Sequence, residues 1–101
     1  MKIVSLFNAP RVPVHLEGYK MHSSSSLDVI HLCLQPGQDM PQHPNQSDVV
    51  ACLIKGEVTL KMGENNIRLL LYDTVEIGKN TDRGFTNNGT EEARLIIMKK
   101  L

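Results

Sequence analysis

Short apolar runs, each closed by turn residues, recur along the whole chain. They occupy positions 2–7, 27–34, 49–54, 57–62, 67–72, 74–77, 84–87 and 93–98. Turn-forming Gly, Pro and Asn residues separate them at 35–37, 55–56, 63–66, 78–80 and 87–89. No helix of three turns fits the pattern of residues between these turns. Strands at a spacing of roughly 8 to 12 residues predict an all-β sandwich or barrel.

The run at 49–54 is apolar on both of its alternating faces, unlike a strand that has one side in water. One face is expected to line the interior of a barrel. The other must be covered by a second sheet, by the N-terminal segment or by another subunit. For so small a domain we predict that a homodimer covers it.

Length and charge narrow the class of protein. A chain of 101 residues, 41% of them hydrophobic, fits a single domain with one core. Lys and Arg balance Asp and Glu at a net charge of zero, so we expect no nucleic-acid partner. Apolar runs are far shorter than the roughly 20 residues of a membrane span, and the N-terminus does not resemble a signal peptide. These features predict a cytoplasmic protein with no membrane partner, in which Cys33 and Cys52 are structural thiols.

Candidate chemistry is concentrated in two segments. In the first, 35–50, Pro44 disfavours a helical conformation for His43, so that His43 and Asn45 are expected to point to the same side of an extended segment. In the second, 77–87, turn residues place Arg83 at the start of a strand. The two segments therefore predict a polar group of side chains inside the barrel.

Two known motifs keep their spacing in this chain. Gly37, His43 and Gly56 fit the first motif, and the turn 78–80 with Asn87 fits the second. Here the chain resembles the small single-domain cupins, over residues 27 to 99. The resemblance implies one domain with a cupin-type double-stranded β-helix, which is a jelly-roll barrel. The barrel is expected at 27–101, and residues 1–26 are expected to form a strand or loop segment that packs on it or on a partner subunit.

The cupin metal site departs from its usual form in this chain. The family binds metal through two His and an acidic residue of the first motif and one His of the second. The corresponding residues here are His43, Asn45, Val49 and Arg83, of which His43 alone is a good ligand for a transition metal. Asp48 lies one residue before the acidic position and faces the other way unless a bulge turns it. The resemblance therefore predicts a degenerate metal site and no cofactor.

The predicted ligand-binding residues comprise three polar groups and three apolar wall residues: His43, Asn45, Arg83, Val49, Ala51 and Leu53. A guanidinium in an apolar barrel needs a carboxylate, an anionic ligand or water as its partner. We therefore expect the barrel to bind a small polar or anionic organic molecule. The alternative for Arg83 is a structural salt bridge to Asp48, Glu76 or Asp82, or exposure at the barrel rim.

Two other functions stay open at this stage. One is a metal-dependent cupin enzyme, of the isomerase or epimerase, decarboxylase or dioxygenase type, whose divalent metal is held by His43 together with Asp48, His31 or Gln42. The other is a structural or regulatory dimer with a filled barrel. His15 and His22 are expected to be solvated.

Overall fold

A computed structural model describes residues 1–12 and 15–101. Within these residues every regular element is a strand, which confirms the all-β prediction. The strands are β1 (Glu17–Ser23), β2 (Leu27–Leu34), β3 (Asp39–His43), β4 (Asp48–Lys55), β5 (Val58–Met62), β6 (Asn65–Leu69), β7 (Thr74–Ile77), β8 (Arg83–Thr86) and β9 (Ala93–Lys100).

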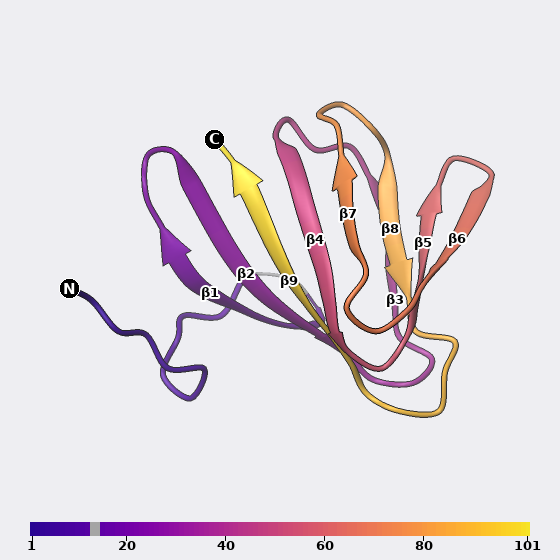
Figure 1. The fold of residues 1–101 in the computed structure, drawn as a ribbon, viewed down its shortest axis with the longest axis horizontal. Helices are drawn as coiled ribbons and strands as arrows, with labels where there is room; N and C mark the ends of the chain where they lie inside the picture. Colours follow the sequence, from indigo (N-terminus) through magenta and orange to yellow (C-terminus); the bar gives the residue numbers. More distant parts are fainter. Residues whose placement is uncertain (13–14) are drawn as a thin grey trace.

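The strands form two antiparallel sheets that face each other. One has the order β1-β2-β9-β4-β7 and the other β3-β8-β5-β6. Figure 1 shows β1, β2, β9 and β4 on the left and the four-stranded sheet on the right. Strands that are neighbours in a sheet are often distant along the chain, so each sheet brings together residues from both halves of the sequence.

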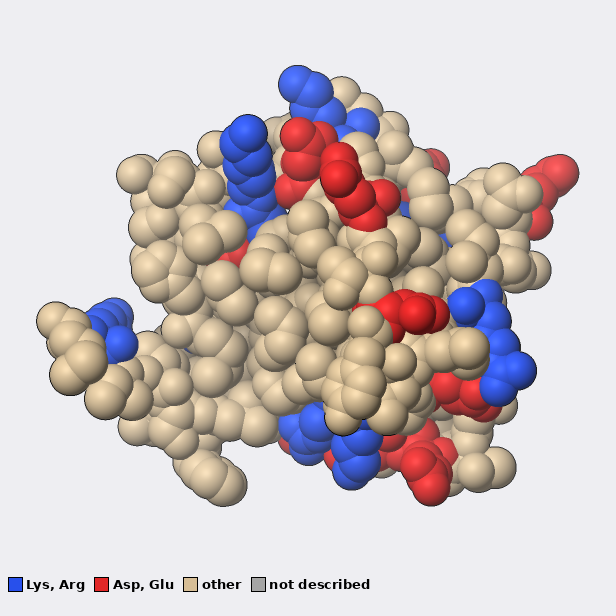
Figure 2. All heavy atoms as spheres, in the orientation of Figure 1, with Lys and Arg blue, Asp and Glu red and all other residues tan. Residues whose placement is uncertain are grey.

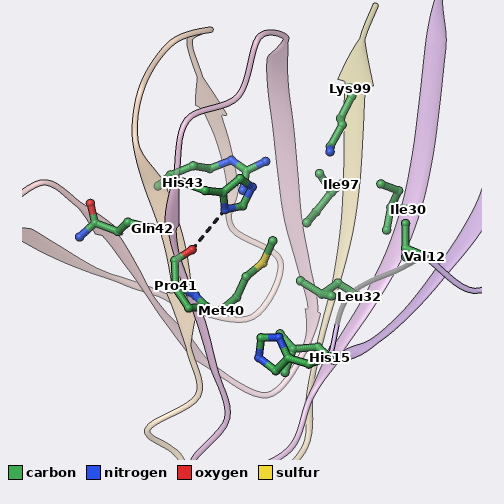
Figure 3. A pocket seen from close by; sticks show the side chains of 12 residues that line it. Val12, His15, Ile30, Leu32, Met40, Pro41, Gln42, His43, Ile97 and Lys99 are labelled. Carbon is green, nitrogen blue, oxygen red and sulfur yellow. Dashed lines mark hydrogen bonds between the residues drawn. The ribbon is translucent and has the colours of Figure 1, made fainter.

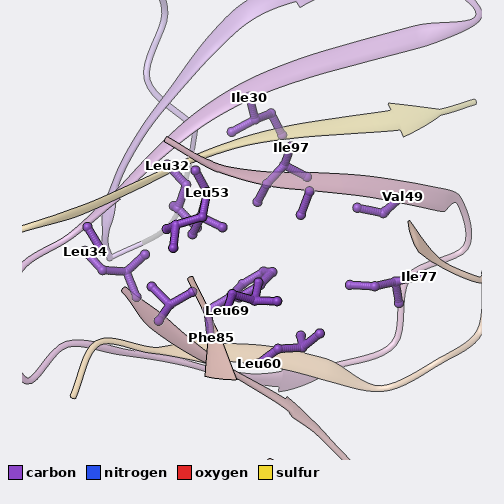
Figure 4. Packing of buried hydrophobic residues seen from close by; sticks show 14 of the residues in the cluster. Ile30, Leu32, Leu34, Val49, Leu53, Leu60, Leu69, Ile77, Phe85 and Ile97 are labelled. Atoms are coloured by element: carbon purple, nitrogen blue, oxygen red, sulfur yellow. The ribbon is translucent and has the colours of Figure 1, made fainter. Parts of the chain in front are cut away.

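Alternate residues of the strands point into the space between the sheets and form the core. On β4 the buried positions are Val49, Ala51 and Leu53, and on β9 they include Leu95 and Ile97. The opposite sheet contributes further buried apolar side chains to the same cluster, among them Leu60, Leu69 and Phe85. Figure 4 shows the labelled members of this cluster meeting between the sheets, among them Val49, Leu60 and Ile97. Aliphatic residues therefore fill most of the interior.

The sequence predicted several strands closely and one wrongly. The runs 27–34 and 74–77 coincide with β2 and β7. The run 2–7 is not a strand: residues 2–5 have no regular structure, and Ile3 and Phe7 are 82% and 100% exposed. A strand needs a neighbouring strand as the partner for its backbone hydrogen bonds, and this apolar run has none among the described residues. Residues 17–23 lie in the predicted N-terminal segment, and in the structure they pair with β2 as β1.

Charged side chains are mixed in sign over the surface. Figure 2 shows Lys and Arg alternating with Asp and Glu around the edge of one face, whose centre carries few charges. No helix among residues 1–12 and 15–101 is long and apolar enough to cross a membrane.

Gly84 allows β3 to lie close against β8. A Cβ atom at this position would come within 2.3 Å of the Met40 carbonyl oxygen and 2.8 Å of the Gln42 nitrogen. These are backbone atoms, so they cannot move aside as a flexible side chain would. We expect Gly84→Ala to displace β3 and to lower the free energy of unfolding by about 1–3 kcal/mol.

Urea denaturation measures this effect. Gly78→Ala is the matched control, because a Cβ atom at Gly78 meets nothing within 4 Å. The control is expected to stay within about 0.5 kcal/mol of the parent. Equal stability of the two variants would show that β3 is free to shift.

Candidate functional site

A cavity of about 400 Å³ lies between the two sheets. Strands β2 and β9 form one wall, β3 and β8 form the other, and residues near the start of β1 border it. The polar side chains at the cavity are Arg83, Lys99, His43, His15 and Gln42. Its apolar side chains are Val12, Leu16, Ile30, Leu32, Met40, Pro41 and Ile97. Of the described residues, no Asp or Glu lines this cavity.

Arg83 is the most unusual residue of the cavity. Its side chain is 1% exposed, and among the described residues its Nε and Nη1 atoms have no hydrogen-bond partner. The guanidinium carbon lies 5.7 Å from the centre of the Phe85 ring, within reach of a cation–π interaction. Burial lowers the pKa of Arg83, although an arginine in a protein keeps its charge. The Arg83 guanidinium is therefore a positive charge at the cavity, and part of its hydrogen-bonding capacity is unused.

The alternative roles predicted for Arg83 differ from this arrangement. No carboxylate of the described residues forms a salt bridge with Arg83, so the expected pairing with Asp48, Glu76 or Asp82 is wrong. Exposure at the rim is also wrong, because the side chain is buried. Arg83 is buried because it is the first residue of strand β8, and all four residues of this strand are buried.

His43 lies directly across from Arg83. The two residues are partners in the antiparallel pairing of β3 with β8, which places their side chains on the same face. His43 Nδ1 is 3.2 Å from the Pro41 carbonyl oxygen, the contact marked in Figure 3. A carbonyl only accepts, so Nδ1 donates and Nε2 of the neutral ring carries a free lone pair. His43 can therefore accept a hydrogen bond through Nε2.

Lys99 supplies a second positive charge that the sequence reasoning missed. Its position alternates with Leu95 and Ile97, the inward residues of β9, and it is half-buried. Figure 3 shows Lys99 beside Ile97 on the wall opposite His43. Burial and then the charge of Arg83 lower the pKa of Lys99. The strand alternation would have revealed this residue, since a lysine at an inward position of a buried strand is uncommon.

His15 borders the cavity from the N-terminal side. It is exposed, as the sequence suggested, and its Nε2 lies 3.2 Å from the Asp39 carbonyl oxygen. Local sequence carries no signal for this placement, because the contact joins residues 24 positions apart.

Four of the predicted ligand-binding residues do not line the cavity. Asn45 lies in the turn after β3, where its side-chain oxygen accepts a hydrogen bond from the Ser47 amide at 3.1 Å. Val49, Ala51 and Leu53 do point inward, but they belong to the buried cluster and are at most 1% exposed. Side chains of the opposite sheet fill the space over β4, so the cavity opens over β2 and β9 instead.

Comparisons with known proteins address the fold. No family model and no curated protein matches this chain. Among solved structures, an RmlC-like cupin family protein with a double-stranded β-helix fold from Methanocaldococcus jannaschii aligns with a TM-score of 0.79 at 22% identity, over 84% of this chain and 79% of that chain. The chain has the cupin fold. The predicted fold class and family resemblance are thereby confirmed.

Two other solved structures align with nearly the whole chain. An RmlC-like cupin from Shewanella frigidimarina has a TM-score of 0.85 at 13% identity, over 99% of this chain and 90% of its own. The polyketide cyclase RemF from Streptomyces resistomycificus has a TM-score of 0.86 at 12% identity, over 99% of this chain and 79% of its own. At these identities the likeness establishes the architecture alone.

The usual cupin metal ligands do not fit this site. Of the four corresponding residues, Val49 is buried in the core and Asn45 bonds the Ser47 amide. Arg83 brings a permanent positive charge beside His43. One imidazole nitrogen next to a guanidinium is a poor site for a divalent cation, which needs three or four protein ligands.

The predicted alternative ligands are also not gathered around His43. Asp48 is exposed and accepts a hydrogen bond from the Lys79 amide at 2.9 Å. Gln42 bonds the Gly63 backbone through both its amide nitrogen and its oxygen. His31 lies on the outer face of β2, with Nε2 3.1 Å from Arg94 Nη1. Asp48 and His31 are thus directed elsewhere, and Gln42 borders the cavity with its amide engaged by the Gly63 backbone.

A separate polar cluster lies on the outer face of the five-stranded sheet. The ligand atoms of Glu17, Cys33 and Glu92 are within 4.8 Å of one another. Burial raises the pKa of Cys33 to about 12, and its thiol donates to Glu92 at 3.1 Å. Arg94 and Lys55 form salt bridges with the same carboxylate. Lys55 and Arg94 therefore balance the charge of Glu92, and Cys33 is a protonated thiol.

Proposed function

We propose that this cupin binds a small organic anion in its barrel and that Arg83 anchors the negative charge. The observation that carries the proposal is a buried guanidinium with two unpartnered nitrogens beside a cavity whose described lining has no carboxylate. A charge in this environment is unfavourable unless a ligand or water compensates it. An anion would compensate it and would form charge-assisted hydrogen bonds.

A neighbouring residue supports the same binding mode. Lys99 adds a second positive charge from the opposite wall. The groups belong to strands of both sheets, so the barrel itself holds them in place. Such a preformed site loses little side-chain entropy when a ligand binds.

Thermal shift with a small panel tests this function. The panel is hexanoate, gluconate and inorganic phosphate, with hexylamine as a cationic control. At least one anion is expected to raise the melting temperature, and hexylamine is not, because its ammonium is repelled by Arg83 and Lys99. A panel without any responding anion, or an equal response to hexylamine, would contradict the proposal.

Lys99→Met is expected to weaken the binding of the responding anion about tenfold, because a hydrogen bond to a charged partner contributes about 1.5 kcal/mol or more. Lys100→Met is the matched control, since Lys100 is the next residue of β9 and is exposed. Because the pKa of Lys99 is lowered, its ammonium loses its proton at a lower pH than an ordinary lysine. Anion affinity should therefore fall as the pH rises through that pKa.

Isothermal titration of both variants and the parent, repeated at increasing pH, measures these effects. In Lys99→Met the decline associated with Lys99 should be absent. Equal affinities of the two variants would exclude Lys99 from the site.

A further inference from the structure

The two ends of the cavity differ in chemistry. Arg83, Lys99 and His43 lie toward one end, and the apolar residues Ile97 and Leu32 line the space beyond them. Figure 3 shows this order along the walls: Lys99 is followed by Ile97 and then by Leu32 on one side, and His43 by Met40 on the other.

Strand pairing fixes this order. On one wall, Lys99 and Ile97 are successive inward residues of β9, and Ile97 pairs with Ile30. Leu32 is the next inward residue of β2 beyond Ile30. On the other wall, the His43–Arg83 pair is followed by the Met40–Phe85 pair. The positive charges of the two walls thus lie at one level and the apolar side chains at the next.

The dimensions of the cavity limit the ligand. From the level of Lys99 to that of Leu32 the strands advance four residues, or about 13 Å at about 3.3 Å per residue. A cavity of about 400 Å³ holds roughly a dozen water-sized groups at about 30 Å³ each. A carboxylate with a body of several carbon atoms fits within both limits.

Few polar side chains lie near the apolar residues, and two of those at the cavity are already engaged. His15 Nε2 contacts the Asp39 carbonyl oxygen, and the Gln42 amide bonds the Gly63 backbone. A polyhydroxylated ligand would lose more bonds to water there than the lining could replace, which is unfavourable. An apolar body would instead displace water from Ile30, Leu32, Met40 and Ile97.

We infer that the ligand is an amphipathic monocarboxylate, whose carboxylate binds at Arg83 and Lys99 and whose apolar body lies between Met40, Leu32 and Ile97. This inference rests on the proposed anion site and adds the chemical class of its ligand. It narrows the expectation of a small polar or anionic organic molecule to an anion with an apolar body, because the apolar side chains of the cavity outnumber the polar ones.

Calorimetric titration of the parent protein with acetate, butyrate, hexanoate and octanoate tests the inference. Affinity is expected to rise about three- to fourfold for each added methylene, since burial of one methylene contributes about 0.8 kcal/mol. Gluconate matches hexanoate in carbon number and charge but carries hydroxyl groups along its chain. It is expected to bind at least tenfold more weakly than hexanoate.

The outcomes separate this inference from the proposed function. The amphipathic class would be overturned if affinity did not depend on chain length, or if gluconate bound as tightly as hexanoate. Either result would leave the anion site in place. An absence of binding by every anion, or equal binding of hexylamine and hexanoate, would overturn both.

A pair of neighbouring residues provides an independent test. Ile97 is 2% exposed and faces the cavity, whereas Ile96 is on the opposite face of β9. Ile97→Thr is expected to weaken octanoate binding about tenfold while leaving acetate binding within twofold, and Ile96→Thr to change neither. Equal octanoate affinity in a folded Ile97→Thr variant would overturn the inference. If Ile97→Thr does not fold, the chain-length series in the parent decides alone.

Discussion

The Arg83→Met variant is expected to be more stable than the parent in the absence of ligand and to lose its response to anions. Arg83 is buried, and two of its nitrogens have no partner among the described residues. Methionine has a similar length and no charge, so it removes the desolvation penalty while filling much the same space. We expect the free energy of unfolding to rise by about 1–3 kcal/mol.

Urea denaturation with and without hexanoate measures both parts of this prediction. A ligand at 100 times its dissociation constant stabilises the parent by about 2.7 kcal/mol, and the variant should gain nothing. Arg68→Met is the control, because Arg68 is largely exposed and pairs with Glu57. It should change stability by less than about 1 kcal/mol. A clear loss of stability in Arg83→Met would show that the guanidinium serves the fold.

The Asn87→Ala variant is expected to lose about 2–3 kcal/mol of stability without a change in the anion affinity of the folded protein. Asn87 is fully buried, and its amide nitrogen donates to the carbonyls of Leu34 at 2.9 Å and Glu91 at 2.8 Å. Its side-chain oxygen accepts from the Gly89 amide at 2.9 Å. Alanine would leave the buried Leu34 carbonyl and the part-buried groups of Glu91 and Gly89 without this partner.

Chemical denaturation and calorimetric titration together check this second prediction. The matched control is Asn88→Ala, because Asn88 is the next residue and is exposed. It should stay within about 0.5 kcal/mol of the parent. Similar stabilities of the two variants would contradict the structural role assigned to Asn87. An altered affinity in Asn87→Ala would show that it also shapes the cavity.

The fold could be predicted where local pattern and tertiary context agree. Strand β2 alternates apolar residues on its inward face, and turns bound it on both sides, so its limits were predicted correctly. Strand β1 has little such pattern, and it exists because its backbone pairs with β2 over residues 17–23. The run at 2–7 failed for the opposite reason, since its apolar residues found no strand to pair with. Long-range pairing decided both cases.

The site was harder to predict than the fold. The cupin spacing pointed to His43 and Arg83, and the structure places both at the cavity as paired residues of β3 and β8. The spacing does not show which inward residues meet side chains of the opposite sheet. The structure places Val49, Ala51 and Leu53, predicted to line the cavity, in the core. Lys99 lies outside both motifs, so the resemblance does not predict it as a site residue.

The most direct test of the account is to observe the Arg83 guanidinium while an anion binds. Nitrogen-15 spectra of the arginine Nε groups, recorded during a hexanoate titration, resolve Arg83 from Arg11, Arg68 and Arg94, and the spectrum of Arg83→Met identifies its signal. We expect the Arg83 signal to shift with saturation while the other three stay in place. If the Arg83 signal does not move at hexanoate concentrations that stabilise the protein, or if all four shift alike, Arg83 is not the anchor of an anion site.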